Sequence, residues 1–485
     1  MSSPVVENGT LFIDGKWRHA ASGATFASRN PATSELLGMV SDAGAAEVAE
    51  AVAAAQAAAA SWAAKTAYER AAVLAEAHRL MTERADDLAL LMTAEQGKPL
   101  RAARNEVRYA ADFLTWFAEE AKRIYGTTIP SARSDQRFVT VRQPVGIVAA
   151  ITPWNYPMSM ITRKVGPALA AGCTVVLKPA EQTPLCAVAV IQLLEEAGLP
   201  PGVVNLVTTS DPAPVGRALL GSDAVRKLTF TGSTDVGKLL AAEAAGTVKR
   251  VSLELGGHAP FLVFNDADPV YAAKGAALVK FLNTGQACIS PNRIFVHRDI
   301  YPEFLRELSE RVAALRPGNG AQPGITVGPL IDEGAVEKME RHVTDAVGKG
   351  AQLLAGGERL AGDGYDAGAF WAPTLLSEIT PEMLIYREET FGPIAAVTPF
   401  DDEQQVIDMA NDTAYGLASY IYTRDLSRAI RVSEALRFAI VGVNDINPTS
   451  AAAPFGGMKE SGLGREGGQE GIAEYLETKL IGLSV

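Results

Sequence analysis

An alternation of short apolar strands with helical stretches between residues 145 and 255 most restricts what this chain can fold into. Runs rich in valine, isoleucine and leucine predict strands at 145–151, 174–178, 203–207, 227–231 and 250–255. Helical stretches of roughly 10–15 residues separate most of these runs. Such a pattern is typical of a parallel sheet covered on both faces, which binds ligands at the carboxyl ends of its strands. The sequence therefore predicts a doubly wound α/β domain.

A second α/β segment is expected to follow, from about residue 256 to 440. It contains the strand-like segments 294–298 and 395–400 and a predicted helix at 302–314. Before the first strand, the sequence predicts helices at 43–64, 69–92 and 102–123.

Two further segments, 138–142 and 479–485, have the composition of strands that lie outside these units. Each would expose an unpaired edge in a monomer, and an unpaired edge readily accepts a strand from another chain. We therefore expect a homodimer or a homotetramer.

Composition narrows the class of protein. The net charge of −12 argues against a nucleic-acid partner, and no apolar run reaches the roughly 18 residues of a membrane helix. Three cysteines in 485 residues do not form a disulfide framework, so a reducing, cytoplasmic location is expected. The first ten residues lack the features of a secretory signal. The five histidines are scattered, which predicts no catalytic metal.

Cys288 is the first candidate for chemistry. It lies among small polar residues in NTGQACISPNR (283–293), whereas Cys173 and Cys186 lie among aliphatic residues. A reactive thiol needs a partly exposed site and a base or a lowered pKa. A structural cysteine is the alternative for this motif taken alone.

Two more motifs place polar side chains where predicted strands end. Glu254, in SLELGG (252–257), could serve as a general base or form a structural ion pair. Asn155, in ITPWNYP (151–157), could donate to an oxyanion or cap the next helix.

Two segments are suited to binding a dinucleotide. The glycine loop FTGSTDVG (230–237) joins a strand to a helix, and backbone amides at a helix N-terminus bind pyrophosphate. KPAE (178–181) ends the second strand, and a glutamate there can accept hydrogen bonds from ribose hydroxyls. The glycine loop is not a GxGxxG motif.

Taken together, the motifs resemble those of the aldehyde dehydrogenase superfamily in order and spacing, from FIDGKW (12–17) to GREG (464–467). The matching segments are WNYP, KPAE, FTGST, LELGG, GQAC, EETFGP and PFGG. The resemblance implies that fold, with a Rossmann-like NAD-binding domain, an α/β catalytic domain and a small β oligomerisation element. It implies an NAD(P)-binding domain at 1–124 and 144–255, a catalytic domain at 256–440, oligomerisation strands at 125–143 and 465–485, and a return to the active site at 441–464.

The resemblance also implies the catalytic roles. Cys288 is similar to the nucleophile of the family and Glu254 to its general base, while Asn155 and the Cys288 backbone amide match its oxyanion hole. Lys164 and Glu466 match positions near the active site. Members of the family that transfer the acyl group to coenzyme A generally lack this glutamate, so its presence favours hydrolysis of a thioester.

Cofactor binding is likewise implied by resemblance. Lys178 and Glu181 match the ribose-binding pair, Ser233 the pyrophosphate contact, Glu389 the nicotinamide-ribose contact, and Phe391 a position beside the ring. The remaining expected cofactor contacts are Ile151, Thr152, Trp154, Gly232 and Leu255. The expected cofactor is NAD, with NADP as an alternative, because Glu181 would repel a 2′-phosphate where related NADP enzymes carry serine.

Within the family, the chain resembles the succinate-semialdehyde dehydrogenase subgroup. Arg163 matches an arginine that contacts the substrate carboxylate, with a surface ion pair as the alternative, and Thr449 and Ser450 lie where a substrate-contacting serine is expected. Leu282 replaces an expected second arginine. Ser290 replaces a second cysteine, so no redox switch with the nucleophile is expected.

The expected reaction is therefore oxidation of an ω-semialdehyde, such as succinic or glutaric semialdehyde, through a Cys288 thioester. A medium-chain or aromatic aldehyde is the alternative substrate. An inactive structural protein on this scaffold is the alternative class, and a serine hydrolase is excluded because no G-x-S-x-G elbow exists.

Overall fold

Eight strands form the largest of four sheets in the computed structural model, which describes residues 8–485. In sheet order they are β19 (Gly462–Leu463), β11 (Arg250–Glu254), β10 (Val225–Thr231), β7 (Ile147–Ile151), β8 (Thr174–Lys178), β9 (Val204–Leu206), β1 (Leu11–Ile13) and β2 (Lys16–Arg18). The five central strands, from β11 to β9, run parallel. The order reverses between β7 and β10, as in a doubly wound sheet.

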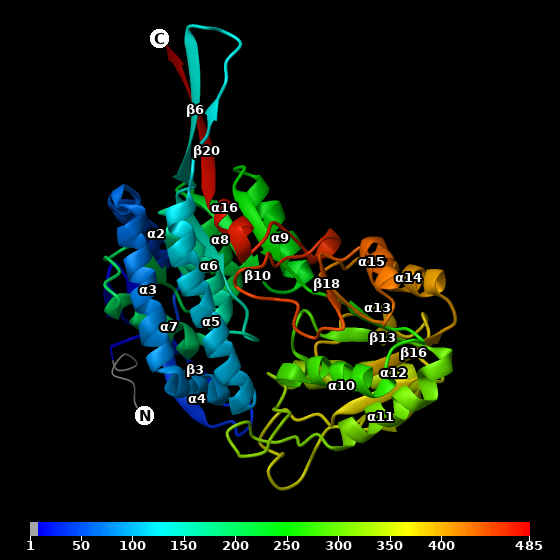
Figure 1. The fold of residues 1–485 in the computed structure, drawn as a ribbon. Helices are drawn as coiled ribbons and strands as arrows, with labels where there is room; N and C mark the ends of the chain where they lie inside the picture. The colour runs from blue at the N-terminus through cyan, green and yellow to red at the C-terminus, as the bar shows by residue number, and fades with distance from the viewer. Residues whose placement is uncertain (1–7) are drawn as a thin grey trace.

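Helices cover both faces of this sheet, and together they form the first lobe (Figure 1). One face packs against α3 (Ala67–Glu83), α4 (Ala85–Gln96), α5 (Leu100–Glu120), α6 (Ser159–Ala171) and α7 (Pro184–Glu196), and the other against α2 (Ala45–Ala64), α8 (Pro212–Gly221) and α9 (Thr234–Ala245). Side chains of β7 alternate between the faces, since Val148 and Ala150 join one core while Ile147 and Ala149 join the other. The predicted α/β class is therefore confirmed.

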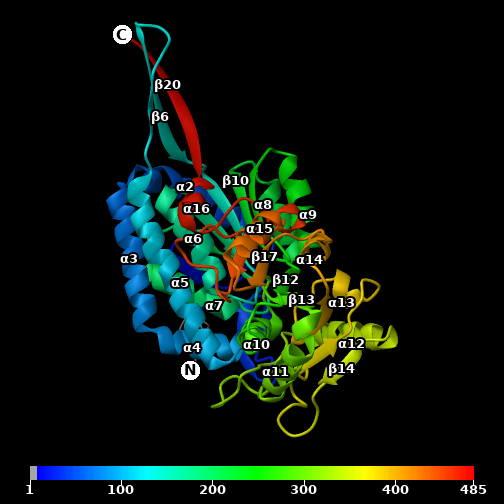
Figure 2. The same ribbon diagram turned by 45° about the vertical axis from the view of Figure 1, so that its right-hand side comes forward.

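The second lobe is built on a seven-stranded sheet. Its order is β14 (Gln352–Ala355), β15 (Thr374–Ser377), β16 (Ile394–Phe400), β13 (Pro291–His297), β12 (Ala259–Val263), β17 (Ala418–Tyr422) and β18 (Ile440–Val443). Its helices are α10 (Pro269–Lys280), α11 (Tyr301–Ala313), α12 (Glu333–Gly348), α13 (Leu384–Arg387), α14 (Glu403–Asn411) and α15 (Leu426–Ala435). Figure 2 shows this lobe turned toward the viewer, beside the helices of the first.

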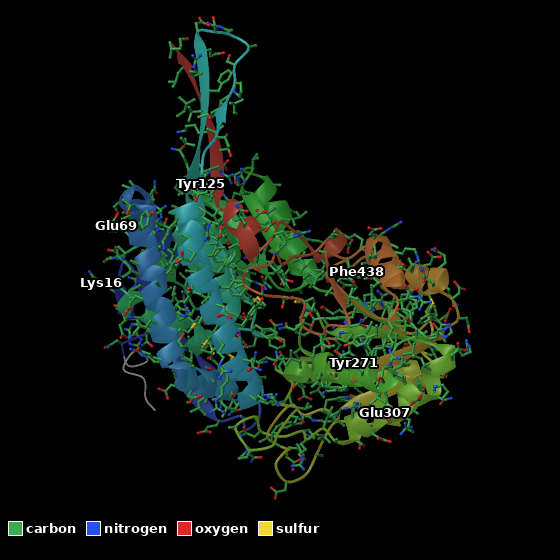
Figure 3. All side chains as sticks on the ribbon, in the orientation of Figure 1. Lys16, Glu69, Tyr125, Tyr271, Glu307 and Phe438 are labelled. Carbon is green, nitrogen blue, oxygen red and sulfur yellow. The ribbon has the colours of Figure 1, made fainter. Side chains whose placement is uncertain are left out.

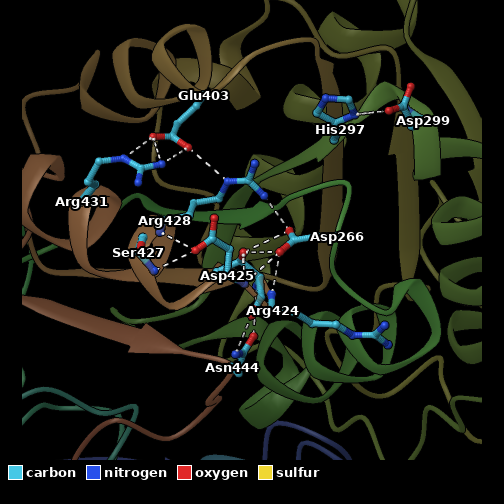
Figure 4. A network of polar contacts seen from close by, with 11 residues as sticks. Asp266, His297, Asp299, Glu403, Arg424, Asp425, Ser427, Arg428, Arg431 and Asn444 are labelled. Atoms are coloured by element: carbon cyan, nitrogen blue, oxygen red, sulfur yellow. Dashed lines mark hydrogen bonds and ion pairs between the residues drawn. The ribbon is translucent and has the colours of Figure 1, made fainter.

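A polar network occupies the carboxyl ends of β12 and β17 in the second lobe (Figure 4). Asp266 accepts hydrogen bonds from Thr423 Oγ1 at 2.8 Å and Arg428 Nη1 at 2.7 Å. Glu403 binds Arg428 and Arg431, with Arg431 Nη2 at 2.9 Å. These side chains bond to one another, so we assign the network a structural role. The candidate site lies at the opposite, amino-terminal edge of this sheet.

A narrow arm projects from the first lobe (Figure 1). Its three antiparallel strands are, in order, β20 (Leu476–Ser484), β6 (Gln136–Pro144) and β5 (Thr128–Ile129). The expectation of two open edges is wrong, because residues 138–142 lie in β6, between β20 and β5. Of these three strands, β20 alone keeps a long free edge. This pairing is long-range, so strand patterning alone could not reveal it.

The helix expected at 69–92 is also wrong as one element. Arg84, with φ −99° and ψ 18°, ends α3 and begins α4, and its guanidinium lies 2.5 Å from Glu196 of α7. Apolar periodicity continues across the break, so the sequence pattern conceals this change of direction.

The remaining elements are short. They comprise the hairpin β3 (Thr25–Arg29) and β4 (Leu36–Ser41), helix α16 (Gly468–Ala473), and the 3₁₀ turns Ala121–Arg123, Leu282–Gly285, Arg298–Ile300 and Lys459–Ser461. Among residues 8–485, no helix has the length and apolar character to cross a bilayer. Residues 1–7, which hold most of the segment considered for a secretory signal, lie outside the described residues. The proposed domain boundaries stay a prediction.

Candidate active site

Three predicted site residues, Ile151, Lys178 and Glu254, lie together at the carboxyl edge of the first sheet. Ile151 pairs with Lys178 on one side and with Phe230 on the other, and Thr231 pairs with Glu254. The register therefore brings the ends of β7, β8, β10 and β11 onto one line. Segments separated by more than a hundred residues in the sequence meet there.

The loop from β10 into α9 offers backbone amides at this edge. Ser233 is the N-cap residue of α9, and Gly232 N donates to Glu254 O at 3.1 Å. A Cβ on Gly237 would lie 2.3 Å from Leu255 Cδ2, so α9 packs directly against the residue that follows β11. The positive end of a twelve-residue helix therefore faces the edge where the other candidate cofactor residues lie.

Lys178 and Glu181 form an ion pair, with Lys178 Nζ 3.1 Å from Glu181 Oε2. Lys178 is buried, whereas a third of the Glu181 side chain is exposed. Thr152 N donates to Lys178 O at 3.1 Å, and the buried Thr152 hydroxyl has no partner among residues 8–485. These groups present donors and an acceptor of the kind that a dinucleotide ribose requires.

Cys288 lies at the amino-terminal edge of the second sheet, just before β13. A Cβ on Gly257 would lie 2.2 Å from Cys288 O, so the LELGG turn touches the backbone of the candidate nucleophile. Three successive residues before it have positive φ angles: Asn283 at 50°, Thr284 at 59° and Gly285 at 74°. Strained backbone of this kind is retained where surrounding contacts fix it, and it is concentrated at functional sites.

Glu254 is buried, and Cys288 beside it is half-buried. Burial raises the pKa of Glu254 to about 7, although the Arg163 guanidinium acts in the opposite direction. Both Glu254 carboxylate oxygens are buried without a hydrogen-bond partner among the described residues. Burial and the nearby Glu254 carboxylate raise the pKa of the Cys288 thiol well above its usual range. The thiol is therefore protonated at neutral pH, beside a carboxylate that can accept its proton.

Asn155 lies in the loop that follows β7 and is buried. Its Nδ2 donates to Gln286 O at 3.1 Å, and its backbone carbonyl accepts a hydrogen bond from Asn283 Nδ2 at 2.9 Å. An amide group carries two hydrogens, so this contact orients the group and leaves one donor for another acceptor.

Arg163, Lys164 and Glu466 form a buried charged cluster. Arg163 Nε lies 2.5 Å from Glu466 Oε2, and Arg163 Nη2 lies 3.6 Å from Glu254 Oε2. The Lys164 ammonium pairs with the other Glu466 oxygen. Arg163 also lies over the Phe455 ring, 4.3 Å from its centroid. Because Arg163 is only 2 % exposed, the alternative of a surface ion pair is wrong.

Tyr109, which no sequence motif indicated, lies on α5 beside this cluster. Burial raises the pKa of its hydroxyl, whereas Arg163 and the Thr449 hydroxyl act in the opposite direction. No motif surrounds Tyr109, so only the packing of α5 against α6 reveals it. Ser450 and Leu282 are both exposed, and Leu282 retains 41 % of its accessible surface.

Glu389 and Phe391 extend the site from the second lobe. Glu389 Oε1 accepts a hydrogen bond from Gly257 N at 2.8 Å, and burial raises the pKa of Glu389 to about 7 while Lys338 acts in the opposite direction. The Phe391 ring meets the Trp154 ring edge-on, with 5.5 Å between centroids. The two lobes therefore contact each other beside the candidate nucleophile.

Among residues 8–485, no group of three or more histidine, cysteine or carboxylate side chains could hold a metal ion. A cavity of about 450 Å³ reaches Glu181 and Gln182 from the β3–β4 hairpin, but its lining does not include Cys288, Glu254 or Asn155. The cavity therefore lies beside Glu181, at one end of the candidate cofactor site, and not beside the candidate nucleophile.

Comparison with known proteins decides the family. The model of the aldehyde dehydrogenase family matches residues 17–481. The chain belongs to the aldehyde dehydrogenase family. Members of this family oxidise small aldehydes with NAD(P)⁺, so the predicted family, fold and enzyme class are confirmed.

Individual relatives are similar over nearly their whole length. The chain is 52 % identical to a 3-sulfolactaldehyde dehydrogenase of Pseudomonas putida, over 99 % of this chain and 98 % of the relative. It is also 52 % identical to a glutarate-semialdehyde dehydrogenase of Pseudomonas putida, over 98 % and 97 % of the two chains. A crystal structure of succinate-semialdehyde dehydrogenase from Burkholderia pseudomallei superimposes with a TM-score of 0.97 at 49 % identity, covering all of both chains.

Proposed function

We propose that this aldehyde dehydrogenase oxidises aldehydes whose far end is anionic, ω-semialdehydes above all, to the carboxylate. The observation that carries the proposal is the buried Arg163 guanidinium, which lies 3.6 Å from Glu254 and within electrostatic range of Cys288. Its Nε and Nη2 contact Glu466, Glu254 and Met160, and we assign Nη1 to the substrate carboxylate. The relatives named for succinate and glutarate semialdehyde support this substrate class.

The reaction begins at Cys288. Glu254 accepts the thiol proton while the sulfur attacks the carbonyl carbon, which forms a carbon–sulfur bond and a tetrahedral thiohemiacetal. The free hydrogen of the Asn155 amide and the Cys288 backbone amide stabilise the oxyanion. When this oxyanion collapses, the C–H bond breaks and a hydride leaves for the acceptor that NAD(P)⁺ would supply, so that an acyl group stays bound to Cys288 as a thioester.

Residues at the carboxyl edge of the first sheet fit a dinucleotide. We assign Ser233 and the N-terminus of α9 to the pyrophosphate, Lys178 and Glu181 to one ribose, and Glu389 to the other. The buried Thr152 hydroxyl, which has no partner in the described part of the chain, supports a ligand at this edge. When bound, NAD(P)⁺ supplies the hydride acceptor.

Glu254 first passes the thiol proton to solvent and then acts a second time. It removes a proton from water, the resulting hydroxyl adds to the thioester carbon, and the carbon–sulfur bond breaks to release the carboxylate. The thiolate of Cys288 is protonated again. We propose that the Lys164–Glu466 pair keeps Arg163 and Glu254 in place during both steps.

We propose that the pocket holds the far carboxylate of the substrate only weakly, and we call this a loose pocket. Leu282 stands where a second arginine was expected, so one guanidinium binds the substrate carboxylate. A charge-assisted hydrogen bond of this kind contributes about 1.5–3 kcal/mol. Longer semialdehydes such as glutaric semialdehyde should therefore compete well with succinic semialdehyde. A sulfonate-bearing aldehyde is the second candidate, because a relative at 52 % identity is named for one.

A substrate panel tests this proposal by comparing anionic with neutral aldehydes on one enzyme. Rates of NADH formation are measured for succinic semialdehyde, glutaric semialdehyde, 3-sulfolactaldehyde and hexanal, on the native enzyme and on Arg163→Ala. The variant should lose activity toward anionic aldehydes selectively. An equal loss of activity toward hexanal would show that Arg163 has only a structural role. A preference of more than about 100-fold for succinic semialdehyde, or about 2.7 kcal/mol, would refute the loose pocket.

We also propose a cytoplasmic location, which three free cysteines support. Cell fractionation with a cytoplasmic marker tests it, and enrichment of the protein in an oxidising compartment would contradict it.

A further inference from the structure

A buried ion pair lies directly beneath the loop that carries Asn155. Lys98 follows Gly97, the residue at the carboxyl end of α4, and Glu106 lies on α5. Their side chains are 1 % and 0 % exposed, and the Lys98 ammonium is paired with Glu106 Oε2. Neither residue belongs to a motif that the sequence linked to chemistry.

Both partners bind the loop just after the Asn155 side chain. Lys98 Nζ donates to the Asn155 carbonyl at 2.7 Å and lies 4.2 Å from the centroid of the Tyr156 ring. Glu106 Oε1 accepts hydrogen bonds from Met158 N at 3.1 Å and from the backbone amide of the next residue at 3.3 Å. The pair therefore holds the backbone before and after the turn.

The second lobe completes this arrangement. Asn283 Nδ2 donates to the same Asn155 carbonyl at 2.9 Å, and Asn155 Nδ2 donates to Gln286 O at 3.1 Å. The carbonyl thus accepts two hydrogen bonds, one from each lobe. Because hydrogen bonds from a charged donor are stronger than neutral ones, Lys98 provides the firmer of the two.

Stability alone does not explain why two charges are buried here. A buried ion pair is weak evidence for stability, since apolar residues of similar volume often serve a core equally well. An apolar pair could neither donate to the Asn155 carbonyl nor accept from the two amides that follow. We propose that Lys98 and Glu106 are positioning residues that fix Asn155 as the oxyanion donor. This inference rests on the proposed function of Asn155.

A double-mutant cycle tests the proposal. The rate constant of the first burst of NADH is measured by stopped flow for the native enzyme, Lys98→Met, Asn155→Ala and the double variant. We expect Lys98→Met to slow the burst about 10- to 100-fold, because a small misplacement of a catalytic group has effects of this size. In the Asn155→Ala background the same substitution should slow it by less than about 3-fold, because no oxyanion donor is left to position.

Lys227→Met provides the matched control. Lys227 is also fully buried and pairs with a carboxylate, Glu474, at 3.5 Å, but it lies on β10 and donates to Ser252 rather than to the Asn155 loop. Thermal melting and the dissociation constant for NAD are measured on every variant. Lys227→Met should lower the melting temperature without the large loss of burst rate.

The possible results separate the two roles. Equal losses from Lys98→Met in both backgrounds, or an unchanged burst in a folded Lys98→Met enzyme, would overturn the positioning role alone. An unchanged burst in Asn155→Ala would overturn the oxyanion role and the positioning role together. If Lys98→Met does not fold, Lys98→Arg enters the same cycle. It keeps a charge beside Glu106 but replaces the single ammonium with a planar group, so the same non-additivity is expected.

Discussion

At the scale of single residues, the protonation of Glu254 is coupled to that of Cys288. Burial raises the pKa of both groups, and each lies in the electrostatic field of the other. Arg163 favours the ionised form of Glu254, whereas Glu466 favours the protonated form. A carboxylate held near neutrality in this way is well suited to accept a proton from a thiol and later from water.

The pH dependence of thioester hydrolysis follows from the pKa of Glu254. Because the base must be ionised, the rate of hydrolysis should reach its maximum above about pH 8. Below a pKa of about 7 the rate should fall roughly tenfold for each pH unit. Steady-state turnover under conditions where hydrolysis limits the rate measures this profile. Glu254→Gln, which cannot ionise, serves as the control and should lose the inflection. A native profile that is flat between pH 5.5 and 8 would contradict the assignment.

At the scale of elements, the loop before Cys288 depends on backbone that only glycine adopts freely. Gly285 has a φ of 74°, and a Cβ there would lie 2.1 Å from Gly392 O. Gly285→Ala should destabilise the fold by more than about 1 kcal/mol and reduce turnover, because the loop must move. Gly198→Ala is the control, since φ is 86° there and a Cβ would meet no atom within 4 Å. Similar melting temperatures and activities for the two variants would refute the role of this contact.

The end of β8 should set the choice between cofactors. Glu181 can accept hydrogen bonds from both hydroxyls of the adenosine ribose but would repel a 2′-phosphate, while Lys178 offsets part of that repulsion. We predict a higher kcat/KM with NAD than with NADP, and a shift toward NADP in Glu181→Ser. Parallel assays with the two cofactors measure this preference. A tenfold advantage of the native enzyme for NADP would overturn the prediction.

Sequence reasoning succeeded where a local pattern reports directly on structure. The apolar runs ending at Ile151, Lys178 and Glu254 predicted parallel strands, and the register of the sheet then aligned their ends. Sequence reasoning failed for contacts between segments that lie far apart in the sequence. The pairing of β6 with β20 and the contact of Lys98 with Asn155 join segments with no shared pattern, so the sequence could not indicate either.

At the scale of the whole molecule, the candidate site lies where the two sheets meet. Only residues 255–258 separate β11 of the first sheet from β12 of the second. The carboxyl edge of one sheet thereby faces the amino-terminal edge of the other, which brings Glu254 close to Cys288. A small rotation of the lobes would separate Glu254 from Cys288, and we propose that the Trp154–Phe391 contact between the lobes helps to prevent it.

The arm supports the predicted homodimer or homotetramer. Strand β20 has a free backbone edge and carries exposed Leu480 and Leu483, at 60 % and 46 %, and Tyr125 at the base of the arm is exposed (Figure 3). A long apolar edge is a site for pairing with another chain. Light scattering should give a multiple of 51.1 kDa, and Leu480→Lys should weaken the assembly. A stable monomer of the native protein at micromolar concentration would contradict this prediction.

The central claim is that one aldehyde becomes one thioester on Cys288, which Glu254 then hydrolyses. Glu254→Gln is mixed with NAD and succinic semialdehyde, and NADH formation is followed while intact-protein and peptide mass spectrometry record the acyl group. We predict a slowed burst that still reaches about one NADH per site, because water must then take the Cys288 proton. Turnover afterwards should be slower still, and an acyl adduct should form on Cys288 that is absent from Cys288→Ala. Undiminished steady-state turnover in either variant, or an adduct on another residue, would contradict the claim.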